Sequence, residues 1–345
     1  MKSVFRVDIN SHIPIYKQLL ASYEQAYDRG NLQAGECLPS MNELAAQFSI
    51  SKETAKKVYS ILRERGLVES MHGKGFFVTP RREERKLKVF MMLDKLSQFK
   101  QILYDAFIQE IGNRAEIAIY LYNQNIDTFE EFIDQALNKY YDYYLITPHF
   151  HFEPEIQSRA FNALKRIPNR KLILLDKEIR SLPGNYGVIC QDYANDIYTA
   201  LGPCLDELRK FKKIHAVTLP TTIYGSLITK SLSQFCNDNN LVLEFHDGVT
   251  DDMVHEGGLY VVLNGQLDMG LVDLARISDE KGLEIGKDMG IITYNDSYLS
   301  DIVLGGLTTV STDFKQMGRL AAEMVLTNNL RKVHCDFRLN RRKTF

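Results

Sequence analysis

Apolar residues recur at helical spacing in the first part of the chain, and a different pattern follows. The spacing predicts one helix from Ile15 to a stop near Gly30, and a second helix that begins at the capping box Ser40–Glu43. A third predicted helix runs from Ser51 to Arg65. Two short strands, 67–70 and 76–78, enclose a glycine-rich turn. Three helices followed by a hairpin predict a winged helix-turn-helix.

From residue 89 onward, short apolar runs alternate with segments of helical periodicity. The predicted strands are 89–93, 115–121, 143–146, 171–175, 213–219, 260–263 and 289–294, and the predicted helices are 98–111, 129–139, 153–165, 193–208, 226–238 and 268–281. Such alternation predicts parallel strands joined by crossover helices. The number of strands requires two sheets, so this part is of the α/β class.

The charge of the chain changes at the same place. Residues 1–86 hold 14 Lys and Arg against 10 Asp and Glu, whereas the remaining residues hold 28 against 34. The segment 81–87 is highly charged and has no apolar stripe, so we expect a linker there. A small basic excess is compatible with nucleic-acid binding, although solvated surfaces vary by as much.

The third predicted helix has a basic face. On a helical wheel, Ala55, Val58 and Leu62 fall on the side expected to face the core. The opposite side carries Lys and Arg together with Tyr59, and a helix of this kind can enter the major groove with its first residues at base edges. The alternative is an ordinary solvated helix. The turn 71–75 favours DNA binding over a solvated helix, because a cation between two glycines can reach a minor groove or a phosphate.

Six segments within residues 13–78 carry a recognisable pattern: Ile13-Pro-Ile-Tyr, Leu38-Pro-Ser, Glu43-Leu-Ala, Ile50-Ser-Lys, Leu62-Arg-Glu-Arg-Gly-Leu-Val-Glu-Ser and Gly73-Lys-Gly-Phe-Phe-Val. Together they resemble the winged helix-turn-helix of GntR-type bacterial repressors. The resemblance implies DNA-binding residues at Ser40, Asn42, Ser51, Lys52, Thr54, Lys56, His72, Gly73, Lys74 and Gly75. The family usually has Arg where Asn42 stands, which puts one operator contact in doubt.

Polar and aromatic residues follow the strands of the α/β part. In parallel sheets ligands bind beyond the carboxyl ends of the strands, so these loops are the expected effector site. The candidate effector-binding residues are Asp94, Lys95, Phe99, His149, Asp176, Lys177, Tyr224, Asn264, Asn295 and Asp296. Carboxylates, amides and an aromatic wall suit a neutral sugar. The alternative is that Asn and Asp residues after strands only cap the next helix.

A second pattern lies in two C-terminal segments, Met289-Gly-Ile-Ile-Thr-Tyr-Asn-Asp-Ser-Tyr-Leu-Ser and Gly306-Leu-Thr-Thr-Val-Ser-Thr-Asp-Phe-Lys-Gln-Met-Gly-Arg-Leu-Ala-Ala-Glu. These segments resemble LacI-type effector domains, which are similar to periplasmic sugar-binding proteins. The resemblance implies two lobes with crossings near 188–192, 305–309 and 328–332. It implies ligand contacts at Asp176, Asn264, and Asn295 or Asp296. The family's R-x-x-G-F element has no clear counterpart around 224–232, so sugar recognition is expected to be rearranged.

The full expectation is a winged helix-turn-helix at 1–80, a linker at 81–87 and a two-lobed periplasmic-binding-protein-like domain with parallel sheets at 88–345. That expectation assigns 88–190 and 308–330 to the first lobe, and 191–306 and 331–345 to the second.

The expected protein is a cytoplasmic transcriptional repressor of a sugar-utilisation operon, released from operator DNA by a sugar effector and acting as a homodimer. No apolar run is long enough to cross a membrane, and the five cysteines show neither a zinc nor a disulfide spacing.

Other functions are weaker alternatives. A regulator that responds to a phosphosugar or another small acid remains open, because Lys95, Lys177, His149 and His151 offer cations near the same loops. A metal-dependent enzyme fused to the DNA-binding module is disfavoured: His149 and His151 lack a third ligand at a recognisable spacing, and no nucleotide-binding or hydrolase motif is present. A transport binding protein is disfavoured by the fused DNA-binding module. No metal, cofactor or catalytic residue is expected.

Overall fold

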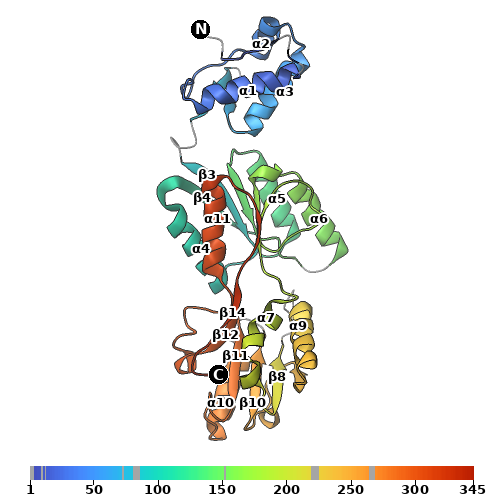
Figure 1. Ribbon diagram of the computed structural model, residues 1–345, viewed down its shortest axis with the longest axis vertical. Coiled ribbons are helices and arrows are strands. Elements are labelled where there is room, and N and C mark those ends of the chain that lie inside the picture. Colours follow the sequence, from blue (N-terminus) through green and yellow to red (C-terminus); the bar gives the residue numbers. More distant parts are fainter. Residues whose placement is uncertain are drawn as a thin grey trace. The chain divides into compact units, whose positions relative to one another are not determined.

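The computed structural model describes residues 4–8, 11, 13–71, 74–80, 86–150, 153–218, 225–263 and 269–345. The chain divides into two compact units, the first comprising Met1–Lys88 with Asn113–Glu116, and the second Val89–Gly112 with Ile117–Phe345. Figure 1 colours both units along the sequence. Within the described residues, no helix is both long enough and apolar enough to cross a bilayer.

The first unit contains the predicted helices and hairpin. Its elements are α1 (Ile15–Asp28), α2 (Met41–Phe48), α3 (Lys52–Glu64), β1 (Val68–Met71) and β2 (Gly75–Val78). Strands β1 and β2 pair antiparallel, with Val68 opposite Val78. The apolar faces of the three helices close around Leu19, Leu44 and Val58, all fully buried. The winged helix-turn-helix predicted from the sequence is present.

Side-chain caps set the starts of α2 and α3. The Ser40 hydroxyl accepts a hydrogen bond from the Glu43 backbone N–H at 3.2 Å, and the Glu43 carboxylate accepts one from the Ser40 N–H at 2.7 Å. This confirms the predicted capping box. Ser51 caps α3 by accepting from the Thr54 N–H at 3.1 Å. Each cap satisfies donors that the first helical turn leaves unpaired, a contribution of about 1 kcal/mol.

Tyr59 departs from the wheel-based expectation, which placed it on the polar face of the third helix. The side chain is 1% exposed, its ring stacks on Phe76 of β2 with centroids 4.0 Å apart, and its hydroxyl donates to the Pro39 carbonyl. The wheel shows only the helix, whereas β2 covers that side of α3. The contact attaches the wing to α3.

The second unit has two lobes, each built on a six-stranded sheet among the described residues. The first lobe contains β3 (Leu87–Leu93), α4 (Gln98–Ile111), β4 (Ala115–Leu121), α5 (Ile126–Leu137), β5 (Tyr143–Ile146), α6 (Pro154–Lys165), β6 (Leu172–Asp176), β7 (Gly187–Cys190), α11 (Phe314–Thr327) and β13 (Lys332–His334). The strand order is β13-β7-β6-β5-β3-β4. Helix α11, red in Figure 1, packs on α4 although the two are distant in sequence. A Cβ at Gly318 of α11 would lie 2.2 Å from the Leu103 carbonyl, so this approach requires glycine.

The second lobe contains α7 (Asp196–Leu201), α8 (Leu205–Leu208), β8 (Lys213–Val217), α9 (Gly225–Asp238), β9 (Leu243–His246), β10 (Gly258–Val262), α10 (Met269–Glu280), β11 (Gly290–Tyr294), β12 (Thr308–Thr312) and β14 (Phe337–Asn340). The strand order is β14-β12-β11-β10-β8-β9, with β14 antiparallel to β12 and the other pairs parallel. The α/β class and the two parallel sheets agree with the sequence, except for β14.

The boundaries between the lobes differ from those expected. Strand β12 was assigned to the first lobe, but it pairs with β11 in the second. Strand β13 was assigned to the second lobe, but it pairs with β7 in the first. The second and third crossings therefore lie at 312–314 and 334–337, several residues after the expected places. Strand pairing decides these boundaries, and the local pattern of either strand fits both sheets.

Candidate functional site

The exposed start of α3 carries the cations proposed to bind DNA. Lys52 and Lys56 are exposed, and the Lys56 side chain retains 67% of its accessible surface while its Nζ lies 3.9 Å from Glu53. Thr54 is half-buried and its hydroxyl is 2.9 Å from that of Ser51. Ser40 and Asn42 are exposed at the start of α2. The fold thus presents these predicted residues at the helix starts of the helix-turn-helix, where they can contact DNA.

The wing carries the other predicted DNA contacts. Lys74 is exposed beside β2, and Gly75 has a φ of 108°, a backbone conformation that favours glycine. His72 and Gly73 lie outside the described residues. Because Tyr59 stacks on Phe76, α3 and the strand β2 that follows Lys74 belong to one packed unit.

In the second unit, three predicted effector residues meet at the strand ends of the first lobe. Asp94 follows β3, His149 follows β5 and Asp176 ends β6, and all three are buried. His149 Nε2 lies 3.1 Å from Asp176 Oδ2, and His149 Nδ1 lies 3.5 Å from Asp94 Oδ2. The expectation that these loops converge is met for these three residues.

Lys100, which sequence analysis did not select, completes this buried charge network. Its side chain, on the first turn of α4, is 5% exposed; Nζ forms an ion pair with Asp176 and lies 3.6 Å from Asp94 Oδ1. Two carboxylates therefore face one ammonium and one imidazole. The charges compensate one another when His149 is protonated, which is what a buried set of charges requires.

The network shifts the pKa of each member. Burial alone raises the pKa of Asp176, but Lys100 and His149 outweigh it and hold that pKa well below the ordinary range. Burial lowers the pKa of His149, but the Asp176 and Asp94 carboxylates outweigh it and raise that pKa above 6.5. Folding therefore favours the protonated imidazole of His149.

A pH dependence of stability follows from His149. Because its folded pKa is raised, its contribution is complete below about pH 6.5 and is lost as the pH rises through the folded pKa, with a slope of at most about 1.4 kcal/mol per pH unit. We expect the free energy of urea unfolding of the second unit to fall as the pH rises above about 6.5, and His149→Gln to remove that decline. His334→Gln, an exposed histidine of β13, is the control. Parallel pH curves for the parent and His149→Gln would contradict the assignment.

Gln191 connects this network to the second lobe. Its amide nitrogen donates to Asp176 and to the Tyr193 hydroxyl at 2.9 Å, while its amide oxygen accepts from Thr312 Oγ1 at 2.6 Å. Gln191 follows β7 at the first crossing, and Thr312 ends β12 at the second crossing. These hydrogen bonds therefore join the Asp176 carboxylate of the first lobe to the first and second crossings.

At the end of β11, two buried polar atoms have no hydrogen-bond partner among the described residues. They are the Tyr294 hydroxyl and the Asn295 amide oxygen. Asn295 has a φ of 69°, and Asp176 has a φ of 75° at the end of β6. Left-handed backbone at non-glycine residues costs free energy and is concentrated at functional sites. Two strand ends thus combine backbone strain with buried polar groups.

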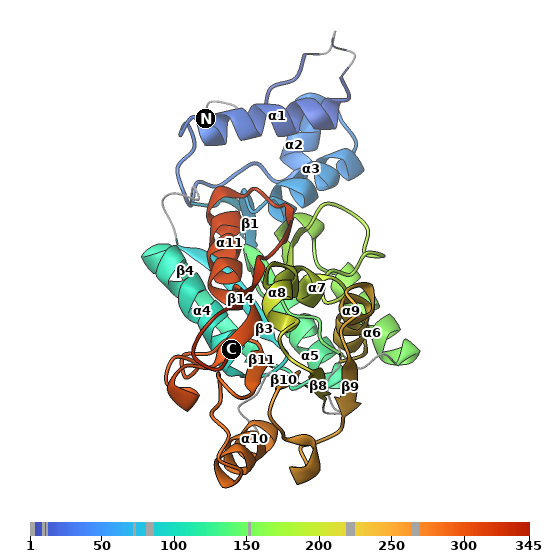
Figure 2. The same cartoon turned by 60° about the horizontal axis from the view of Figure 1, so that its bottom comes forward.

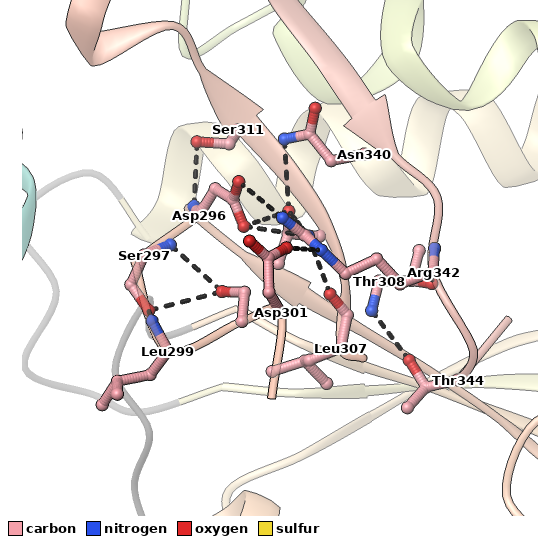
Figure 3. Close-up of polar contacts among 12 residues, drawn as sticks. Asp296, Ser297, Leu299, Asp301, Leu307, Thr308, Ser311, Asn340, Arg342 and Thr344 are labelled. Carbon is pink, nitrogen blue, oxygen red and sulfur yellow. Dashed lines mark hydrogen bonds and ion pairs between the residues drawn. The ribbon is translucent and has the colours of Figure 1, made fainter. Parts of the chain in front are cut away.

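Asp296, predicted to bind hydroxyl groups, already has a strong protein partner. Arg342 binds both of its carboxylate oxygens at 3.0 Å and also binds Asp301 at 2.6 Å (Figure 3). The Thr309 hydroxyl donates to Asp296 at 3.0 Å. A cavity of about 180 Å³ is lined by Asp296, Asp301 and Arg342 with Ile102, Ser297, Tyr298, Ser311, Thr312, Asp313, Phe314, Lys315, Arg338 and Asn340. Of the predicted effector residues that the structure describes, Asp296 alone lines it.

The remaining predicted effector residues either have other surroundings or lie outside the described residues. Phe99 stacks on Phe314 of α11 with ring centroids 5.5 Å apart, so its ring packs against protein. Lys95 is exposed, and Lys177 is half-buried with its pKa lowered by burial. Tyr224 and Asn264 lie outside the described residues, as does His151.

Sequence reasoning missed Lys100, Gln191, Tyr193, Thr312 and Arg342. Lys100 stands on a predicted helix, where lysine is ordinarily solvated, and no local pattern marks it as buried. Gln191 could have been selected from the sequence, because it directly follows an apolar run and lies within a predicted crossing between the lobes.

The profile of bacterial regulatory proteins of the gntR family matches residues 15–78, and the profile of the periplasmic binding protein-like domain matches residues 263–334. The HTH-type transcriptional repressor YtrA of Bacillus subtilis is 28% identical over 103 residues, which span 30% of this chain and 78% of YtrA. The mannosyl-D-glycerate transport/metabolism system repressor MngR of Escherichia coli is 27% identical over 126 residues, 36% of this chain and 47% of MngR. The chain thus spans less than half of MngR.

Among solved structures, the trehalose repressor from Escherichia coli is similar with a TM-score of 0.57 and 11% identity, and the alignment covers 74% of this chain and all of that chain. At this identity the similarity shows the fold. It agrees with the two-lobed architecture expected from the C-terminal runs.

Proposed function

Because this chain joins a winged helix-turn-helix domain of the GntR type to a periplasmic-binding-protein-like domain, we propose that it is a transcriptional repressor whose DNA affinity is set by a small-molecule effector. The observation that carries the proposal is the exposed basic start of α3 in a chain that also contains a two-lobed binding fold. Repressors among the relatives support the direction of control. Since it acts on chromosomal DNA, the protein would work in the cytoplasm.

We assign the effector to the neutral sugars. In the buried network the charges of Lys100 and His149 compensate those of Asp94 and Asp176, and Arg342 compensates Asp296. At the end of β11, the buried groups that have no hydrogen-bond partner among the described residues, Tyr294 Oη and Asn295 Oδ1, are uncharged. Uncharged donors and acceptors suit hydroxyl groups, whereas a phosphate requires unpaired cations. The trehalose repressor among the similar structures supports this class, whereas mannosyl-D-glycerate carries a carboxylate, so the similarity to its repressor supports a sugar effector but favours the acidic alternative.

The effector acts by a population shift in this proposal. A ligand that prefers one arrangement of the lobes stabilises that arrangement by its difference in affinity for the two states. The hydrogen bonds of Gln191 with Asp176 and Thr312 are the contacts that a change at the crossings would alter. No catalytic step is part of the proposal, because the acidic and basic groups of the network are paired with one another.

The DNA-binding function is tested by selection from a random duplex library with the full-length protein. One winged domain contacts few base pairs, so we expect an inverted repeat bound by a homodimer. Sedimentation of the complex should give two chains per duplex. Recovery of no common sequence, or one chain on a selected duplex at micromolar protein, would refute this function.

The effector class is tested by a thermal-shift screen of neutral monosaccharides and disaccharides against their phosphates. A neutral hit is expected to bind about tenfold more weakly to Asn295→Ala, because a ligand hydroxyl loses its partner, about 1.4 kcal/mol. Asp134→Ala, an exposed residue of α5, is the matched control. Hits confined to phosphorylated compounds would overturn the neutral-sugar assignment, and equal affinity in Asn295→Ala would place the site elsewhere.

A further inference from the structure

Three of the chain's eight histidines gather at the edge of the second lobe's sheet. His215 lies on β8, His246 ends the edge strand β9, and His255 lies in the segment before β10. Strands β8 and β9 are parallel neighbours (Figure 2). The His215 ring centroid is 5.1 Å from that of His246 and 5.2 Å from that of His255. These residues belong neither to the DNA-binding surface nor to the buried charge network.

The donor atoms of this cluster are spaced for a metal ion. His215 Nδ1 and His246 Nε2 are 3.0 Å apart. Two nitrogens on one tetrahedral zinc, at about 2.0–2.1 Å each, stand about 3.3 Å apart, so only a small adjustment is needed. Glu244 is the register partner of His215 across the two strands. One donor atom from each of the three residues lies within 4.8 Å of the others.

Packing alone does not explain why a histidine is buried at position 215. The side chain is 2% exposed, its ring stacks on Tyr260 at 5.0 Å, and Nε2 has no hydrogen-bond partner among the described residues. A phenylalanine would make the same stack without burying a polar atom. Burial, followed by the neighbouring His246 and His255, lowers the pKa of His215 to about 4.

His255 is held close to this cluster. Its backbone N–H donates to the Tyr260 hydroxyl at 2.9 Å, and that hydroxyl donates to the Met253 carbonyl at 2.7 Å. The His255 ring places Nδ1 3.2 Å from the Glu256 carbonyl oxygen. When Nδ1 donates to that carbonyl, Nε2 keeps its lone pair, which is how backbone carbonyls orient metal-binding imidazoles.

We propose that His215, Glu244 and His246 form a binding site for a divalent transition-metal ion, with zinc as the preferred ion and the His255 ring next to His215. Two imidazoles and a carboxylate are donors that zinc accepts. Lys213 Nζ now lies 2.9 Å from Glu244, and the bound ion replaces Lys213 as the partner of that half-exposed carboxylate. The ion would join the edge strand β9 to β8 and thereby stabilise the second lobe.

The test uses the full chain, purified without a histidine tag and treated with a chelator that is then removed. Calorimetric titration with zinc chloride is expected to show one ion per chain at micromolar affinity or tighter. Cobalt(II) is expected to give the visible absorption of a tetrahedral site. The absence of saturable zinc binding at 100 µM or below, taken as about the weakest affinity of a built site, would overturn the proposal.

Variants localise the site. His246→Gln is expected to weaken zinc binding by on the order of 100-fold, and Glu244→Gln by about tenfold. Because Glu244 is exposed, its variant keeps the test valid even where His246→Gln perturbs folding. His334→Gln, an exposed histidine beside Cys190 in the first lobe, is the control and should bind zinc like the parent. Undiminished affinity in both site variants, or loss in His334→Gln alone, would refute this location.

Discussion

Asp176→Ala is expected to lower the free energy of unfolding of the second unit by about 3 to 5 kcal/mol. The carboxylate is 3% exposed and accepts from Lys100, Gln191 and the Tyr193 hydroxyl. Its removal leaves the buried Lys100 ammonium with Asp94 at 3.6 Å as its remaining counter-charge. An uncompensated buried charge costs far more than an ordinary lost contact. Urea unfolding monitored by circular dichroism measures the change.

Two further variants separate this mechanism from a general effect of truncation. Combining Lys100→Met with Asp176→Ala removes the buried Lys100 ammonium that has lost its partner, so the double variant should be more stable than Asp176→Ala alone. Asp134→Ala removes an aspartate whose ion pair with Arg166 is about half exposed, and should cost less than about 1 kcal/mol. A loss for Asp176→Ala no larger than that of Asp134→Ala would show that the network is not buried as described.

Lys56→Glu is expected to weaken binding to the selected operator by about 1 to 3 kcal/mol, roughly 5- to 150-fold. Lys56 lies on the exposed face of α3, where a cation meets DNA phosphates or base edges. Reversal of its charge removes that contact and adds repulsion from the DNA. Electrophoretic mobility shift at moderate salt measures the change, and parent binding should fall steeply as salt rises.

Lys57→Glu is the matched control for this prediction. It makes the same change of net charge on the same helix, but Lys57 Nζ lies 3.9 Å from the ring centroid of Tyr16 on α1, away from the basic face. Its effect on operator affinity should be clearly smaller. Equal losses for the two variants would mean that net charge alone governs binding and that α3 is not the recognition helix.

Local signals in the sequence were sufficient for most secondary structure. The capping box at Ser40 and the stop at Gly66 define helix ends through backbone hydrogen bonds within a few residues, and the structure confirms both. The helix 98–111 and the strands 115–121 and 143–146 coincide with α4, β4 and β5. At β9, prediction failed because the local signal was weak. Strand β9 is a four-residue edge strand, half exposed and without an apolar run, and was not predicted.

One predicted helix was too long for a reason that the sequence contains. The segment 193–208 was expected to be continuous, but the structure divides it into α7 and α8 around Gly202 and Pro203. Proline lacks the backbone donor and its ring displaces the preceding turn, so a break at this dipeptide follows from elementary rules.

The sequence by itself determined the winged helix-turn-helix, the α/β class and the convergence of Asp94, His149 and Asp176, because caps, periodicity and parallel strand ends are local properties. Tertiary structure decided which partner each group finds: Lys100 is brought to Asp176, Arg342 to Asp296, and β12 and β13 to their sheets. These choices depend on burial and on pairing between residues that are distant in the sequence, and the two ion pairs each join residues more than 40 positions apart. From the sequence alone, a charged residue or a strand edge could pair with many partners. Packing selects one of them, because a buried charge or backbone donor that is left unpaired costs several kcal/mol.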